Sequence, residues 1–170
     1  MTDCWAEWIR ARRTGGDAEF DHWQTSEHIP ERVGVPGFLR GRRYTVLTGS
    51  PRYFTLYETE SVATLQSEGY LARLNAPTPW TSKCVQLFRN NRRTACRTST
   101  SLGVGTGGVM ATLELGPLAD KDAMLRAWLT GTALPALVSR PGIVAAQVMF
   151  VVQAIINFFI RGSPPRNRHP

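Results

Sequence analysis

A gapless internal repeat limits what this chain can fold into more than any other feature. Residues 17–44 align with residues 122–149 at a constant displacement of 105 positions, and eight of the 28 aligned pairs are identical. The identical pairs are Asp17/Asp122, Ala18/Ala123, Trp23/Trp128, Thr25/Thr130, Pro30/Pro135, Val33/Val138, Pro36/Pro141 and Gly37/Gly142. Agreement of this kind over one continuous stretch indicates a duplicated structural unit.

The repeated stretch predicts a helix followed by a strand. Asp17 is a suitable N-cap for a helix that runs to about Arg32. On a helix of regular pitch, one face carries Phe20, Trp23, Glu27 and Pro30. Because Pro30 removes an amide donor and clashes with the preceding turn, we expect the helix to kink or loosen near His28.

The rest of residues 1–97 completes a β-α-β-β-α-β pattern. Apolar alternation and turn residues predict strands at 4–10, 38–47, 52–60 and from 84 into 90–97, a helix within 61–74, and a rigid loop at 75–81. This order of elements is the ferredoxin-like arrangement. The expected fold class is therefore α+β, with a first ferredoxin-like unit at 1–97.

The duplication predicts a second, incomplete ferredoxin-like unit at 108–152. A Ser/Thr/Gly linker is expected at 98–107, between the two units. Within the second unit we expect a strand at 108–116, a helix at about 120–138 and a strand at about 142–151. Residues 153–170 match nothing in the first unit, and we expect an atypical tail that is disordered from about residue 162.

Charge and cysteine content bear on compartment and partners. The formal net charge is +7, and a basic surface favours polyanions in general. The arginines of 89–97 lack the exposed aromatic strand pattern of an RNA-binding domain, so nucleic acid is not an expected partner. The three cysteines lie far apart without a CxxC pair, and no apolar segment opens the chain. We therefore expect reduced thiols and a cytoplasmic protein.

One apolar stretch raises the question of a membrane helix. Residues 143–160 are 18 consecutive residues without a charge. Three polar residues, Gln147, Gln153 and Asn157, interrupt their apolar character. A spanning helix needs about 20 predominantly apolar residues. The repeat also assigns the first half of this stretch to a strand, so a membrane is not an expected partner.

Several motifs resemble the EthD-like branch of the dimeric α/β-barrel proteins. They are FDHW, EHIPER, VPGF and RRY within 20–44, SPRYFTLYE at 50–58, PTPWT at 77–81 and FRNNRR at 88–93. The resemblance covers 17–97 well and 108–150 more loosely, and it points to the subgroup with two ferredoxin-like units in one chain. It implies two four-stranded sheets that meet face to face as a barrel, within one chain or in a homodimer.

The resemblance also implies a cofactor-independent enzyme of isomerase, cyclase, lyase or monooxygenase type. Its substrate would be a small aromatic or polyketide-like molecule. His28 is the candidate for proton transfer, because an imidazole titrates near neutral pH, and Glu27 is close enough to orient it. Alternatively, His28 caps the loosened helix or packs at the sheet edge. Glu27 would then form a salt bridge with one of three arginines, Arg40, Arg42 or Arg43.

Aromatic residues supply the candidate substrate contacts. These are Trp23, Tyr44, Tyr57 and Trp80, for which core packing is the alternative. No His, Cys and carboxylate set has the spacing of a metal site, so neither a metal nor a cofactor is expected. A second function stays open: a non-catalytic ligand-binding or assembly module, including a degenerate relic of the family. Its incomplete unit would associate with another chain.

Overall fold

The chain divides into two compact units. Unit 1 comprises residues 1–97 together with 151–170, and unit 2 comprises residues 98–150. The computed structural model describes residues 2–11, 17–48 and 51–152. The predicted tail at 153–170 lies outside the described residues.

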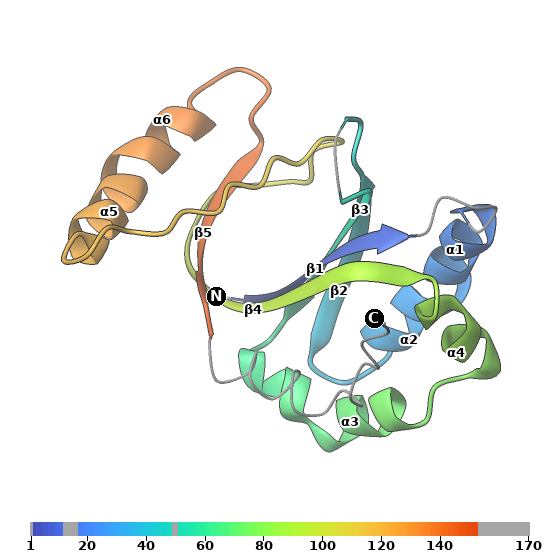
Figure 1. The fold of residues 1–170 in the computed structure, drawn as a ribbon. Coiled ribbons are helices and arrows are strands. Elements are labelled where there is room, and N and C mark those ends of the chain that lie inside the picture. Colours follow the sequence, from blue (N-terminus) through green and yellow to red (C-terminus); the bar gives the residue numbers. More distant parts are fainter. Residues whose placement is uncertain (1, 12–16, 49–50, 153–170) are drawn as a thin grey trace. The chain divides into compact units, whose positions relative to one another are not determined.

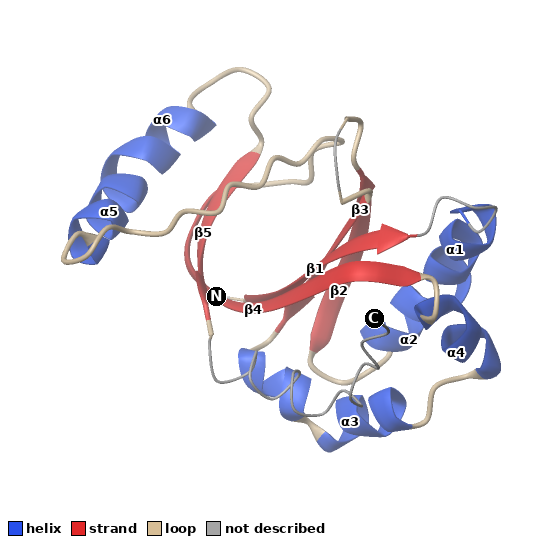
Figure 2. Cartoon of the chain, in the orientation of Figure 1, coloured by secondary structure: helices blue, strands red, loops and turns tan. Residues whose placement is uncertain are grey.

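Unit 1 is built on an antiparallel sheet (Figures 1 and 2). Its strands are β1 (Asp3–Ala11), β2 (Phe38–Thr45), β3 (Tyr53–Thr59) and β4 (Phe88–Gly103). The strand order in unit 1 is β2-β3-β1-β4. β4 continues past residue 97 into unit 2, which also contains β5 (Ala145–Val151). The predicted α+β class is confirmed, and this sheet is compatible with a ferredoxin-like fold.

The helices of unit 1 pack on one face of the sheet and form a core with two apolar clusters. The helices are α1 (Asp17–Trp23), α2 (Ile29–Val33), α3 (Glu68–Asn75) and α4 (Pro79–Val85), with a 3₁₀ turn at Val62–Gln66. The Trp23 cluster consists of Phe20, Trp23, Tyr53 and Cys84. The Tyr70 cluster consists of Val35, Phe38, Tyr57, Val62, Leu65, Tyr70 and Ala95. On β3, alternation directs Tyr53 and Tyr57 into these clusters, and Thr55 lies between them.

A π-helical turn at Gln24–His28 joins α1 to α2, and the Ile29 amide donates to the Gln24 carbonyl. The predicted loosening near His28 is therefore confirmed. Unit 2 repeats this feature in the same frame: α5 (Asp122–Trp128), a π-helical turn at Leu129–Ala133, and α6 (Leu134–Val138). Gly37 and Gly142 lie in the turns that follow the two helical segments and have φ angles of +91° and +87°, a conformation that favours glycine. The duplication is thus a duplication of backbone structure.

The π turn changes which residues face the core. A π turn contains one more residue than an α turn, so side chains beyond it are displaced by one position. The face predicted for Glu27 and Pro30 is wrong: Pro30 is exposed and Glu27 half-buried. In their place, Gln24, His28 and Arg32 are buried.

Two expectations within 75–97 are also corrected. Residues 79–85 form α4, although a rigid loop and the start of a strand were predicted there. Thr78 is the reason, because its Oγ1 accepts a hydrogen bond from the Thr81 amide at 2.9 Å, and Pro79 occupies the first helical turn, where proline is tolerated. The strand then begins at Phe88.

In unit 2, the expected linker and the first expected strand are corrected. Residues 98–103 extend β4, and Ser99 Oγ donates to the Val148 carbonyl on β5 at 3.3 Å. Residues 108–116 form no strand, and nearly all of them are exposed, so nothing in unit 2 holds them in a sheet. Among the described helices, none combines the length and the apolar character that crossing a bilayer requires.

Candidate functional site

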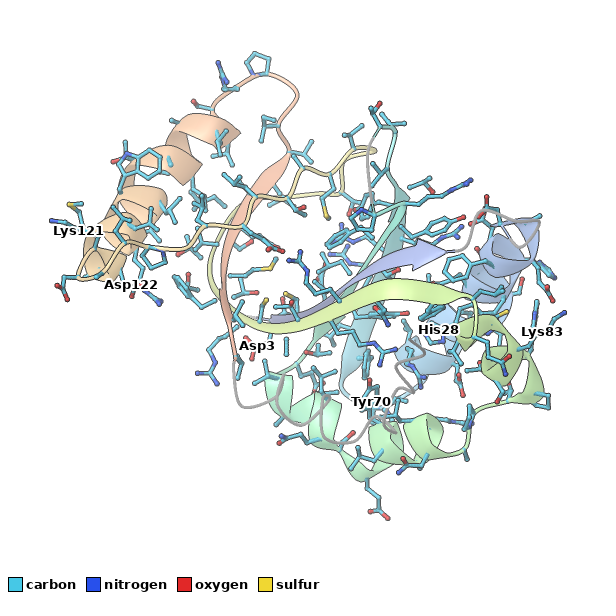
Figure 3. The ribbon with its side chains drawn as sticks, viewed as in Figure 1. Asp3, His28, Tyr70, Lys83, Lys121 and Asp122 are labelled. Atoms are coloured by element: carbon cyan, nitrogen blue, oxygen red, sulfur yellow. The ribbon has the colours of Figure 1, made fainter. Side chains whose placement is uncertain are left out.

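The predicted site residues do not gather in one place. His28 and Trp23 lie on the helix side of the sheet, where their rings are tilted by 32° with centroids 4.4 Å apart (Figure 3 labels His28). Tyr57 points to the same side, into the Tyr70 cluster. Tyr44 pairs across the strands with Phe54, on the opposite face of the sheet. Tyr44 therefore does not share a site with His28.

Glu27 has a different partner from the one predicted. Its Oε1 accepts hydrogen bonds from Thr78 Oγ1 at 2.6 Å and from Thr81 Oγ1 at 2.9 Å. Burial acts to raise the pKa of Glu27, but hydrogen bonds, chiefly from Thr78 and Thr81, lower it overall. Trp23 Nε1 also donates to Thr81 Oγ1, at 3.1 Å. Glu27 thus joins the π turn to the start of α4.

The arginines of β2 pair with other carboxylates, so the predicted salt bridge to Glu27 is wrong. Arg40 and Arg42 both pair with Glu58, because the register of β2 against β3 places Arg40 directly opposite Glu58. Arg43 pairs with Asp21 on α1.

The remaining candidate, Trp80, lies at the edge of the Trp23 cluster, half-buried. Its ring centroid is 5.2 Å from that of the exposed His22. Trp80 therefore has a packing partner of its own on α1.

Sequence reasoning missed a polar stripe on the buried face of the first helical segment. Gln24, His28 and Arg32 follow one another at intervals of four residues, and their side chains are 0%, 3% and 4% exposed. In the repeat, the same positions are Leu129, Ala133 and Leu137. The difference between the two copies could have revealed the stripe from the sequence, because the second helical segment forms with apolar residues at all three positions.

The stripe begins between the two apolar clusters. The Phe20 ring packs on Tyr53 at 4.6 Å between centroids, and Ile29 lies beside Gly41 and Tyr57. The helical segment from Phe20 to Ile29 therefore runs along the face of β3 that carries Thr55. Within the described part of the chain, both amide atoms of Gln24 and the Thr55 hydroxyl are buried without a hydrogen-bond partner. Leaving such buried groups unsatisfied costs about 1–3 kcal/mol each.

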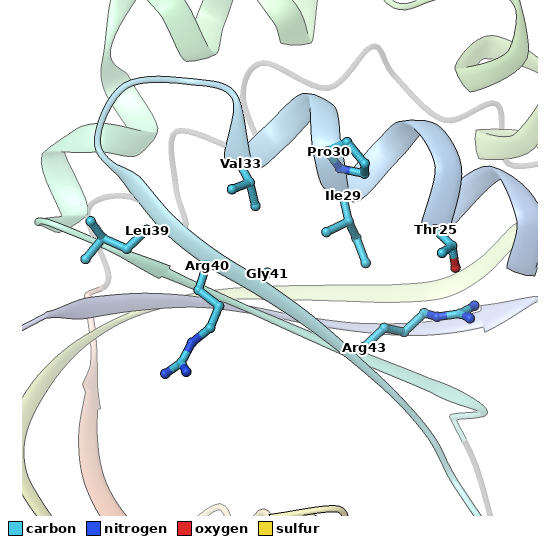
Figure 4. Close-up of a pocket in the computed structure, with 8 residues that line it drawn as sticks. All are labelled: Thr25, Ile29, Pro30, Val33, Leu39, Arg40, Gly41 and Arg43. Carbon is cyan, nitrogen blue, oxygen red and sulfur yellow. The ribbon is translucent and has the colours of Figure 1, made fainter. Parts of the chain in front are cut away.

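A groove of about 570 Å³ lies on the outer side of the same helix, along β2 (Figure 4). It is lined by Thr25, Ile29, Pro30, Val33, Leu39, Arg40, Gly41 and Arg43. None of the predicted site residues lines it. Its two arginines are already paired with Glu58 and Asp21.

All three cysteines are buried, and the thiol pKa is raised at two of them. None of the three forms a disulfide, and Cys4 lies directly opposite Cys96 on the neighbouring strand. A hydrogen bond with Cys96, together with burial, raises the pKa of the Cys4 thiol, and burial raises that of Cys84. Across residues 2–11, 17–48 and 51–152, no group of three His, Cys, Asp or Glu side chains is arranged to hold a metal ion.

Known proteins show only a weak structural similarity to this chain. No protein-family model matches the chain, and no curated protein matches it. Among solved structures, an ethyl tert-butyl ether D (EthD) family protein from Bacillus halodurans C-125 is similar with a TM-score of 0.39 and 15% sequence identity. The similarity covers 55% of this chain and 96% of that chain. The fold described above therefore rests on the strand order and register of this chain itself.

Proposed function

We propose that unit 1 binds a small organic molecule beside the polar stripe and that His28 moves a proton on it. The proposed activity is cofactor-independent, of isomerase, cyclase, lyase or monooxygenase type, as the EthD-like motifs imply. One observation carries the proposal: three buried polar side chains, Gln24, His28 and Arg32, stand where the repeat has Leu129, Ala133 and Leu137. Polar groups that folding does not need, buried and in part without partners, favour a role in recognition or chemistry.

His28 is the group in this stripe suited to proton transfer. An imidazole gains or loses a proton near neutral pH, and its two ring nitrogens can accept and donate in turn. The Trp23 ring fixes one face of the imidazole. We assign Glu27 a positioning role, because its Oε1 already holds Thr78 and Thr81 and so sets where α4 lies against the π turn. Trp23, Tyr57 and Trp80 are proposed as the aromatic surroundings of the ligand.

A thermal-shift titration tests this function. The purified chain is titrated with aromatic acids and polyketide-like phenols, beside His28→Ala and the control His22→Ala. In the second π turn, Ala133 stands at the position equivalent to His28, so we expect His28→Ala to fold. His22 lies on the same helix but is exposed. We expect a ligand-dependent rise in Tm for the parent and for His22→Ala, reduced or lost in His28→Ala.

The outcomes separate the alternatives. Equal ligand responses in the parent and His28→Ala would remove His28 from the site. A cooperative melt that no compound shifts would contradict small-molecule binding and favour an assembly module. The absence of any cooperative melt would favour a relic of the family.

A second function, as an assembly module, has its own supporting observation. Trp128 is 53% exposed, whereas Trp23 at the same place in the frame is fully buried. No charged residue occurs between Arg126 and Arg140, so α6 and the end of α5 offer an apolar surface. We propose that unit 2 is an incomplete ferredoxin-like unit and that this surface associates with the same surface of a second copy, as a twofold homodimer.

Sedimentation equilibrium over a concentration series tests the homodimer. We expect self-association in the parent chain that weakens in Trp128→Gln and persists in the control His22→Gln, which changes an exposed residue of unit 1. A parent chain that stays monomeric at all concentrations would contradict the assembly proposal. Equal association of parent and Trp128→Gln would place the interface elsewhere.

A further inference from the structure

Arg32 is a buried cation that no carboxylate of the described residues neutralises. It is the fourth residue of α2, and its side chain is 4% exposed. Its guanidinium lies over the ring of Tyr70 on α3, with the guanidinium carbon 5.5 Å from the ring centroid (Figure 3 labels Tyr70). Among the described residues, Nε and Nη1 of Arg32 have no hydrogen-bond partner, and no carboxylate pairs with it.

Four other arginines in unit 1 form ion pairs with carboxylates. Arg40 and Arg42 pair with Glu58, Arg43 pairs with Asp21, and Arg52 pairs with Asp17. All four are more exposed than Arg32. Solvent screens an exposed charge much more than a buried one, so among these arginines the need for a counter-ion is greatest at Arg32.

Arg32 cannot avoid the cost of a buried charge by losing its proton, because arginine keeps its charge in proteins. The face of one tyrosine ring attracts a cation but gives it no hydrogen bond. The guanidinium fork is shaped to bind a carboxylate through two parallel hydrogen bonds. The fold does not require a cation here, because Leu137 holds the same position in α6.

We propose that Arg32 binds the carboxylate of a small organic acid. This inference rests on the proposed function, because it names the substrate class of the same site. His28 precedes Arg32 by four residues, which is about 6 Å along a helix. If Arg32 holds the carboxylate of a ligand, the part of the ligand about 6 Å from that carboxylate lies near His28. Gln24, one turn further, offers an amide that donates and accepts.

The test compares acids with their neutral amides on the full chain. Formate, acetate, benzoate and 4-hydroxybenzoate are titrated at constant ionic strength in a chloride background, beside formamide, acetamide, benzamide and 4-hydroxybenzamide. The variants are Arg32→Leu, which copies Leu137, Arg32→Lys, which keeps the charge but loses the fork, and Arg73→Leu as an exposed control on α3. Binding is followed by Tm and by calorimetry.

We expect at least one carboxylate to bind the parent chain and Arg73→Leu more tightly than its amide does. In Arg32→Leu the Kd for the carboxylate should rise about tenfold or more, with a smaller rise in Arg32→Lys. Without ligand, Arg32→Leu should melt no lower than the parent chain, since it removes an unpaired buried charge.

Three results would overturn the inference: no acid binds the parent chain, acid and amide bind equally, or Arg32→Leu keeps the preference for acids. They also separate it from the function it rests on. If amides and acids bind alike and His28→Ala abolishes both, the His28 site stands and the assignment of Arg32 fails. If no compound of either kind binds the parent chain, both fail.

Discussion

Glu27 shows, at the scale of one residue, how a carboxylate can organise two helices without an ion pair. Its Oε1 accepts hydrogen bonds from Thr78 and Thr81, which belong to the N-terminal end of α4, while Glu27 itself lies in the π turn. These bonds need the charged form of the carboxylate to be strong. They lower its pKa in the folded chain from the ordinary value of 4.5, against the opposing effect of burial.

This pKa shift predicts a pH dependence of stability. A carboxylate with a lowered pKa in the folded state stabilises the fold above its unfolded pKa and loses that contribution as the pH falls through the folded value. We therefore expect the free energy of unfolding of the parent chain to exceed that of Glu27→Gln at pH 6–7. The difference should shrink as the pH falls below about 4.5. Urea unfolding from pH 7 to pH 3 measures it, and a difference independent of pH would contradict the assignment.

Gly41 lies where α2 packs closely against β2. A Cβ at Gly41 would lie 2.9 Å from Ile29 Cγ2 and 3.0 Å from the Tyr57 ring, so α2 can approach β2 only over a glycine. Gly41→Ala should lower the free energy of unfolding by about 1–3 kcal/mol, the usual cost of overpacking.

The matched control for this prediction is Gly131→Ala. Gly131 lies in the second π turn, where a Cβ would meet no atom within 4 Å. An alanine there should be neutral or stabilise by up to about 1 kcal/mol, because glycine is unfavourable in a helical segment. Both variants are compared by urea unfolding. Equal effects of the two substitutions would contradict the close approach at Gly41.

At the scale of elements, α4 depends on a single capping residue. Thr78 Oγ1 accepts from the Thr81 amide and donates to Glu27, so one hydroxyl both begins the helix and attaches it to the π turn. Thr78→Ala should destabilise the chain by about 1–3 kcal/mol, the sum of a lost cap and a lost hydrogen bond. Thr78→Ser keeps the hydroxyl and should stay within about 0.5 kcal/mol of the parent chain. Equal losses in urea unfolding would show that the hydroxyl is not the cause.

The same residues explain which elements the sequence could predict. The helix from Asp17 and the strand after Gly37 were predictable, because a cap, a proline and a glycine mark their ends and the repeat presents them twice. α4 was not, because Thr78-Pro79 suits a loop as well as a capped helix with proline in its first turn. The strand expected at 108–116 failed because a strand needs a neighbour, and apolar residues alone do not supply one.

The candidate site was harder to predict than the fold. His28 was found because its chemistry is distinctive, but the extra residue in the π turn brings Arg32 into the core, where a regular pitch placed Pro30. The partners of the β2 arginines depended on strand register, which a register shift between Phe38 and Arg40 sets. Residue types alone reveal neither the π turn nor the strand register.

At the scale of the whole molecule, one helical frame serves two units with different degrees of burial. Phe20, Trp23 and His28 of unit 1 are almost fully covered, whereas in unit 2 Trp128 is 53% and Leu137 42% exposed. Helices as short as these owe their stability to packing of one face more than to intrinsic propensity. The two copies should therefore differ in local stability although their backbones are alike.

Amide hydrogen exchange of the two copies measures this difference. We expect peptides from 122–138 to exchange at least about tenfold faster than those from 17–33 in a dilute sample, because burial of one large apolar side chain is worth about 1.5–3 kcal/mol against local opening. If the apolar surface of unit 2 is an interface between copies, protection of 122–138 should rise with protein concentration, while that of 17–33 stays constant. Equal protection of both segments at every concentration would contradict the difference in burial and the homodimer alike, because only a face covered within one chain resists exchange regardless of dilution.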